Sequence, residues 1–280
     1  MRCKVFNTYE FSFAGESSLM YGLMVYDIGG TSQSNVSFGN TASIVETRLN
    51  NRIQPIHFGV NYHSKPLEFK LVFGSDRALD RYELENISFW LTGHQDYQWL
   101  SIDQPDLERV QFRCLITSLT PLAHGWLPVA FEATVRCDCP YAYGFPFEKS
   151  YQIKGTTRIL FRNESSMREY LKPVLTFKPA TDTRQLSIIN HNDNGREFRL
   201  ENLPSGEDVN GGYFYANIDN ANGIIVSVSG DKDNTIEGQY NLYNGFNLNF
   251  FRLVHGDNVL EVTGDGVLTI SGRFLYNVAG

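Results

Sequence analysis

The chain has 280 residues, 42% of them hydrophobic and 20% charged, which is ordinary for a folded protein with a sizeable core and leaves room for about two domains or one large β domain. The formal net charge of -7 disfavours a surface built to neutralise nucleic-acid phosphates, and no run reaches the ~18 apolar residues of a membrane helix. The 20 Phe and 15 Tyr residues favour β-strands.

The first elements are expected in FSFAGESSLMYGLMVYDIGG, residues 11–30. A secretion signal is not expected, because polar residues interrupt the apolar run before this segment. A nucleophile elbow requires Gly-x-Ser-x-Gly, and the two residues after Ser17 are serine and leucine, so the second glycine is missing. Residues 26–35 lack the lysine and the helix start of a phosphate loop. The segment is therefore predicted to be a strand, a Gly-Ser turn and a second strand.

Three later segments of the first half alternate apolar and polar residues, as strands with one buried face do. They cover residues 67–73, 110–116 and 129–137. Cys114 and Cys137 fall on the apolar phase, where a free cysteine acts as a small hydrophobic residue. Neither Cys3 nor the C-x-C pair of Cys137 and Cys139 completes the spacing of a zinc or redox motif, so buried thiols are favoured.

One segment breaks this alternation and is predicted to be an α-helix. Residues 75–93 carry apolar side chains three or four positions apart, with Ser75 or Asp76 expected to cap the start and Gly93 to end it. The expected apolar face consists of Leu79, Tyr82, Leu84, Ile87, Trp90 and Leu91. The carboxylates expected on the solvated side of this helix, rather than as a catalytic pair, are Asp76, Asp80, Glu83 and Glu85.

A domain boundary is predicted at residues 139–150, CPYAYGFPFEKS, where two prolines and a glycine separate strand patterns. We interpret this segment as a linker partly pinned by its aromatic residues. Beyond it, clusters of Asn and Gly alternate with short apolar runs, which is typical of an antiparallel sandwich. The runs are LSII, YFYANI, IIVSVS, LNFFRLV, VLEV and VLTI. The expected domains are residues 1–143 and 144–280.

The remaining candidate ligands do not form a convincing site. Alternation places His57 and His63 on one strand face, but structural or surface roles are favoured over a ligand pair. GDKDN at 230–234, with Asp231 and Asp233, resembles part of a calcium loop and lacks its terminal Glu. The sequence therefore predicts no catalytic, cofactor-binding or metal-binding residue and no cofactor, and the chain is not expected to be an enzyme.

The order of the segments resembles the distal tail protein family of long-tailed bacteriophages with non-contractile tails. The resemblance begins with FSFAGESSLMYGLMV, continues with PLEFKLVFGS and LDRYELENISFWLTG, and then follows YQWLSID and VQFRCLIT. FRNESSMREYLKPVLTF resembles the entry to the family's second domain, and NFFRLVHGDNVLEVTGDGVLTISGRF resembles its closing segment. Each motif is a strand–turn pattern, and it is the ordered series over nearly the whole chain that is specific.

The resemblance implies a mainly β fold. The expected parts are an N-terminal β-sandwich-like domain with one helix and an extended arm, and a C-terminal galectin-like antiparallel β-sandwich. It further implies a homo-hexameric ring, single or as two stacked rings, in which the arm clasps the neighbouring subunit. Residues 31–63 are the candidate arm.

The partners implied by the resemblance are the tail tube protein on one side of the ring and the tail-tip hub (tail-associated) protein on the other. In some relatives the outer domain attaches receptor-binding proteins. Neither specific nucleic-acid binding nor membrane insertion is implied. The expected location is the distal end of the virion tail, after synthesis in the cytoplasm of the bacterial host. A non-catalytic carbohydrate-binding (lectin-like) β-sandwich is the alternative, and a chain for glycoside hydrolysis is a third class.

Overall fold

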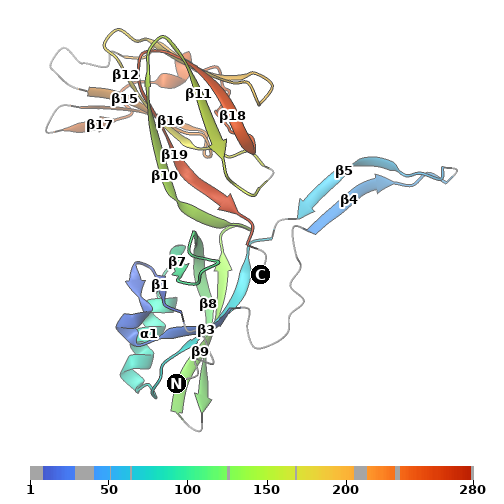
Figure 1. Ribbon diagram of the computed structural model, residues 1–280, viewed down its shortest axis with the longest axis vertical. Helices are drawn as coiled ribbons and strands as arrows, with labels where there is room; N and C mark the ends of the chain where they lie inside the picture. Colours follow the sequence, from blue (N-terminus) through green and yellow to red (C-terminus); the bar gives the residue numbers. More distant parts are fainter. Residues whose placement is uncertain are drawn as a thin grey trace. The chain divides into compact units, whose positions relative to one another are not determined.

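The computed structural model describes residues 9–28, 41–50, 52–63, 65–124, 127–167, 169–204, 213–230 and 234–278. In these residues the protein is mainly β with one α-helix, and its sheets are antiparallel (Figure 1), as the sequence predicted. The chain divides into two compact units, unit 1 with Met1–Gly144 and Tyr276–Gly280, and unit 2 with Phe145–Leu275. No helix of the described residues has the length and apolarity to span a membrane.

Unit 1 holds the one α-helix and most of the longer strands of the first half. Its elements are β1 (Phe11–Phe13), β2 (Glu16–Ser17), the 3-10 helix η1 (Ser18–Tyr21), β3 (Met24–Ile28), β4 (Thr41–Thr47), β5 (Ile56–His63), β6 (Glu68–Gly74), α1 (Arg81–Thr92), β7 (Gln98–Ile102), β8 (Val110–His124), β9 (Leu127–Cys137) and the start of β10 (Ala142–Ile153).

The main sheet of unit 1 has the order β3-β6-β9-β8-β7-β1-β2. The residues just before β1 also pair with β3, at the far end of this order. Tyr9 N donates to the Val25 carbonyl at 3.2 Å, and Val25 N donates to the Tyr9 carbonyl at 2.8 Å. One apolar core lies on the inner side of this curled sheet. It includes the predicted inward residues Leu71, Phe73, Phe112, Cys114, Phe131, Ala133, Val135 and Cys137. The period-2 prediction for β6, β8 and β9 is therefore confirmed.

Helix α1 starts later than the sequence predicted. The N-cap is Asp80 rather than Ser75 or Asp76, because the Asp80 side chain accepts from the Glu83 backbone N while the Glu83 side chain accepts from the Asp80 backbone N, which makes a capping box. Gly93 ends the helix as predicted. Ile87, Trp90 and Leu91 are buried, but Tyr82 is 76% exposed, so its assignment to the apolar face was wrong.

The opening segment forms β1, a turn, β2 and then η1. This agrees with the predicted strand, turn and strand, and η1 is an additional element. Its serines serve the fold: Ser18 is fully buried and its Oγ accepts from the Phe11 backbone N at 3.2 Å. Ser17 caps η1 by accepting from the Leu19 backbone N at 3.1 Å, and its hydroxyl donates to Glu10 at 2.6 Å. Both hydroxyls are thus engaged in local structure.

Unit 2 is a sandwich of two sheets. One has the order β17-β16-β15-β12-β19-β10 and the other, with 4 strands, the order β11-β18-β13-β14. Phe147 of β10 and Phe161 of β11 meet between them at a ring-centroid distance of 5.8 Å. The elements are β11 (Thr156–Asn163), β12 (Val174–Pro179), β13 (Gln185–Asn190), β14 (Arg196–Glu201), β15 (Tyr213–Asp219), β16 (Ile224–Gly230), β17 (Thr235–Glu237), η2 (Leu242–Gly245), β18 (Gly256–Thr263) and β19 (Gly266–Tyr276).

Residues 139–150 contain the division between the two units, between Gly144 and Phe145, but most of this segment belongs to one strand and is not the linker that was predicted. β10 runs from Ala142 to Ile153 and contains the proline and glycine that suggested a break. Its first residues pair with β8, with Tyr143 opposite Gln111, and its later residues lie beside β19. A strand tolerates a proline where no ladder hydrogen bond is required of its nitrogen, so composition alone misled here.

Candidate assembly surfaces

The clearest exposed apolar surface of unit 1 lies on the hairpin of β4 and β5. These strands pair with each other and with no other strand of the described residues. The exposed large apolar residues of this hairpin, which we call the hairpin surface, are Ile44, Val45, Leu49, Ile53 and Phe58. The hairpin lies within the predicted arm at 31–63, of which residues 31–40 and 51 fall outside the described part of the chain. Exposed apolar groups in this number make the hairpin a candidate contact surface.

The hairpin also carries the two histidines noted in the sequence. The pairing shifts between Val45 and Glu46, which face Gly59 and His57, so Phe58 is an extra residue that forms a bulge. The bulge interrupts the strict alternation on which the His57–His63 pairing rested. The side chain of His63 lies outside the described residues, and the ligand pair stays a hypothesis.

A second exposed apolar surface combines η1 and α1. The two helices are in contact, since the Tyr21 ring stacks on Trp90 at a centroid distance of 4.4 Å. Tyr82 and Phe89 are seven positions apart and therefore share one face of α1. The exposed apolar residues of this helix surface are Leu19, Met20, Tyr82 and Phe89. The helical periodicity of the sequence did not separate this face from the buried one, because both are apolar.

The carboxylates around α1 are structural. Asp80 is the N-cap, and Glu83 pairs with the Arg77 guanidinium. The hydrogen bond from Arg77, followed by the one from the Asp80 backbone, lowers the pKa of Glu83 to about 2. Asp76 precedes the helix instead of lying on it, and both Asp76 and Glu85 are exposed. The lowered pKa of Glu83 is the opposite of what a catalytic general acid requires.

The two core thiols of unit 1 are poor nucleophiles while the strands around them stay closed. Cys114 and Cys137 are buried in the core, as predicted, and burial raises the pKa of both, that of Cys137 to about 12. Such thiols are protonated at neutral pH and are poor nucleophiles and metal ligands. Cys139 is only partly buried, and burial raises its pKa as well. Cys3 lies outside the described residues.

Among the residues that the structure describes, no group of three or more His, Cys, Asp and Glu side chains could hold a metal ion. The calcium-loop candidate is a separate matter, since Asp231 and Asp233 lie outside those residues. The prediction of no metal-binding residue is therefore left standing as a prediction.

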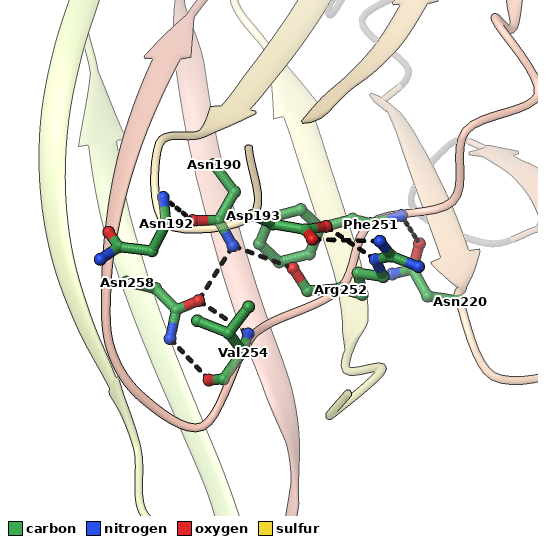
Figure 2. A network of polar contacts seen from close by, with 8 residues as sticks. All are labelled: Asn190, Asn192, Asp193, Asn220, Phe251, Arg252, Val254 and Asn258. Carbon is green, nitrogen blue, oxygen red and sulfur yellow. Dashed lines mark hydrogen bonds and ion pairs between the residues drawn. The ribbon is translucent and has the colours of Figure 1, made fainter. Parts of the chain in front are cut away.

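Unit 2 contains a network of buried asparagines that the sequence reading took for turn markers (Figure 2). Asn190, Asn220 and Asn258 are 1%, 2% and 0% exposed, and Asn163 is as deeply buried. All four side chains reach the backbone of residues 251–254. Because this backbone segment has no neighbouring strand along most of its length, the amides take the place of ladder hydrogen bonds.

The contacts of the network are short and reciprocal. Phe251 N donates to Asn220 Oδ1 at 2.8 Å, and Val254 N donates to Asn258 Oδ1 at 2.9 Å. The Val254 carbonyl accepts from Asn258 at 3.0 Å and from Asn163 at 3.1 Å. Asn190 Nδ2 donates both to the Arg252 carbonyl at 3.2 Å and to Asn258 Oδ1 at 2.9 Å. Figure 2 shows Asn190, Asn220 and Asn258 directed at this segment.

These contacts correct the strand predicted for LNFFRLV, residues 248–254. The segment is irregular and makes only an isolated bridge between Leu253 and Leu171. Its Arg252 is held by Asp193, with Nε donating at 2.7 Å to a carboxylate that is almost fully buried, and its guanidinium lies 3.6 Å from the centre of the Tyr170 ring. A buried charge persists when it is paired in this way.

The alternation of inward and outward residues along each strand could have revealed these asparagines in the sequence. Each one continues the inward-facing row of a strand: Asn163 follows Ile159 and Phe161, and Asn190 follows Leu186 and Ile188. Asn258 stands in the same way before Leu260 and Val262, and Asn220 after Ala216 and Ile218. An asparagine on an apolar phase is buried, and it must therefore have partners.

The comparisons with known proteins agree with this two-part fold. A family model described as a phage tail protein N-terminal domain matches residues 6–139, and one described as a phage tail C-terminal domain matches residues 141–272. Among curated proteins no sequence match was found.

One solved structure with a TM-score above 0.5 has the same fold. The crystal structure of the phage SPP1 Dit protein (gp 19.1), titled a paradigm of the hub adsorption apparatus in phages that infect Gram-positive bacteria, aligns with a TM-score of 0.63 at 11% identity and covers 96% of this chain and 100% of its own. Two activated baseplate structures of phage P2, with Ca and with Sr, align at 11% identity with TM-scores of 0.49 and 0.48, covering 94% and 95% of this chain and 97% of theirs.

The two family models together account for nearly the entire chain, and each matches one of the two halves in the expected order. The resemblance predicted from the ordered sequence segments is thereby confirmed. The chain belongs to a family of phage tail proteins, and its fold is that of a Dit protein.

Proposed function

We propose that this protein is the distal tail protein of its phage, a homo-hexameric adaptor ring between the tail tube and the tail-tip hub. The observation that carries the proposal is the pair of phage tail models that match residues 6–139 and 141–272. The fold shared with SPP1 Dit over 96% of the chain supports it. The proposed role is structural, without catalysis, at the distal end of the tail.

The exposed apolar surfaces of unit 1 are the proposed ring contacts. A cyclic assembly joins two different surfaces of the same chain, so each subunit must present both halves of the interface. The hairpin surface and the helix surface are two such apolar areas on residues of the N-terminal domain, 1–143. We assign the hairpin of β4 and β5 as the arm that clasps the neighbouring subunit, because an isolated pair of strands gains stability from packing on a larger surface.

The C-terminal domain, residues 144–280, is the proposed outer domain. Its buried asparagine network holds an irregular surface segment in one conformation, and Leu248 in this segment is 74% exposed with a φ of 62°. We infer that this domain attaches receptor-binding proteins, while the tube and hub proteins bind the ring itself.

The ring is tested with charge substitutions on the hairpin surface. In the variant with Ile44→Asp and Phe58→Asp, two residues that are 63% and 65% exposed, we expect a folded monomer in place of the ring. Leu160→Asp is the matched control, since Leu160 is 69% exposed and belongs to unit 2. Light scattering after size exclusion measures the mass, circular dichroism checks folding, and negative-stain images show the rings.

A wild-type protein that is monomeric at high concentration contradicts the ring. If that monomer also binds glycans tightly, the lectin-like alternative replaces it. Loss of rings in the Leu160→Asp control as well as in the hairpin variant contradicts the assignment of the arm while leaving the ring itself in place.

A further inference from the structure

The pairing of β8 and β9 places Cys114 directly opposite Cys137. Asp138 N donates to Arg113 O at 3.0 Å between the same two strands, so the adjacent pair is hydrogen-bonded. Cys137 N instead donates to the Leu67 carbonyl at 2.8 Å, away from β8. Because hydrogen-bonded and non-hydrogen-bonded pairs alternate along an antiparallel ladder, the two cysteines form a non-hydrogen-bonded pair.

Such a pair has the spacing that a disulfide requires. Its Cα atoms are about 4.5 Å apart, within the ~4.4–6.8 Å range of disulfides. Both side chains point to the core side of the sheet, since Cys114 and Cys137 are 0% and 1% exposed and share their rows with Phe112 and Val135. The two thiols therefore lie on the same, buried face of the sheet.

We propose that Cys114 and Cys137 are a disulfide-forming site that links β8 to β9 when the protein meets an oxidised low-molecular-weight disulfide. The thiolate of one cysteine attacks this reagent and forms a mixed disulfide, and one thiol leaves. The second cysteine then attacks the sulfur of the first, and the second thiol leaves. The protein loses two electrons and two protons, and the reagent takes them up as its two thiols.

Burial makes this closure slow, since the thiolate forms only when β8 and β9 open locally. The pair stays reduced in a bacterial cytoplasm and closes in an oxidising medium. That setting, a virion component released from its host, rests on the proposed function, whereas the chemistry does not. Cys139 is the competing partner. However, its thiol donates to the Tyr141 carbonyl at 3.1 Å, and it lies two residues beyond Cys137, the last residue of β9, so it is not the residue opposite Cys114.

The test uses the full chain with Cys3→Ser and Cys139→Ser, so that the two opposed cysteines are the only thiols. The protein is incubated with oxidised glutathione, and amide exchange in β8 and β9 is followed to establish that the strands have opened. Unreduced peptide mapping is expected to find one peptide pair joined between Cys114 and Cys137, with no free thiol left. The linked form is expected to unfold with an equilibrium constant on the order of 100-fold smaller than the reduced form.

Cys114→Ala in the same background is the control, and it is expected to keep one thiol without an internal link. If the double serine background does not fold, peptide mapping of the wild-type chain answers the same question. Glutathione adducts without a link, a link to Cys139 in the wild type, or free thiols after the amides have exchanged overturn the proposal. A monomeric protein that forms the Cys114–Cys137 disulfide supports the disulfide site and contradicts the ring. Failure of the disulfide proposal is therefore distinguishable from failure of the proposed function.

Discussion

At the scale of the residue, four asparagines decide the conformation of residues 251–254. An apolar side chain at Asn258 would suit the row of β18 in size, but it would leave the N–H and the carbonyl of Val254 without these partners. An unpaired buried polar group costs about 1–3 kcal/mol. The asparagines are therefore required by the backbone that they serve, and not by a turn.

Asn258→Ala is expected to lower the free energy of unfolding of unit 2 by about 2–3 kcal/mol, because it removes the acceptor of the Val254 N–H, one of the two donors to the Val254 carbonyl and one acceptor of Asn190. Asn217→Ala, on the exposed side of β15, is the matched control, with an expected change within about 0.5 kcal/mol. Urea denaturation followed by circular dichroism measures both. Equal destabilisation by the two substitutions would show that the network has no special role.

At the scale of the element, α1 depends on one charged cap. The Asp80–Glu83 capping box satisfies backbone N–H groups at the helix start, and the ion pair of Glu83 with Arg77 joins it to the preceding segment. The folded-state pKa of Glu83 lies below the ordinary value, at about 2. A lowered pKa means that the carboxylate stabilises the folded state above the unfolded pKa and ceases to do so as the pH falls through the folded one.

We expect the pH dependence of stability to carry this signature. The contribution of Glu83 should be complete above pH 4.5, the ordinary pKa of a glutamate in the unfolded chain, and should disappear progressively down to about pH 2. Glu83→Gln should accordingly lower Tm at pH 6 and converge with the wild type near pH 2. Glu85→Gln, an exposed site on the same helix, should not show this convergence. Thermal melts across this pH range decide the matter, and parallel curves for wild type and Glu83→Gln would contradict it.

At the scale of the whole molecule, unit 1 is discontinuous in sequence. It takes up Tyr276–Gly280 as well as the first 144 residues, and Tyr276 and Val278 pack against its core. β10 and β19 are the two strands in which the chain leaves unit 1 and returns to it. A fragment that stops at the apparent boundary therefore lacks part of the first unit.

Removal of residues 276–280 is expected to destabilise unit 1 by about 1–3 kcal/mol, since it takes two partly buried apolar side chains from the core. Removal of residues 279 and 280 alone is the control and should have little effect. Hydrogen exchange resolved by segment measures the outcome, with faster exchange in the core strands of unit 1 as the expected result. Faster exchange confined to unit 2 would contradict this assignment.

The sequence alone determined what depends on local pattern. Period-2 rows predicted the buried faces of β6, β8 and β9, and the position of Gly93 predicted the end of α1. The order of many such segments, each weak by itself, indicated the phage tail family. These features follow from side-chain alternation and turn chemistry, which neighbouring residues decide.

Only the tertiary structure decided the features that depend on distant partners. The start of α1 is not among them, because the capping box of Asp80 and Glu83 lies within four residues of the sequence, and it outweighed the other candidate caps, Ser75 and Asp76. Residues 142–153 form a strand because β8 and β19 pair with it, despite its proline and glycine. Residues 248–254 do not form one, because asparagines of three strands and Asn220, which follows β15, satisfy the backbone of residues 251–254 first. A hydrogen-bond partner far away in the chain outweighs local propensity, and no sequence window contains it.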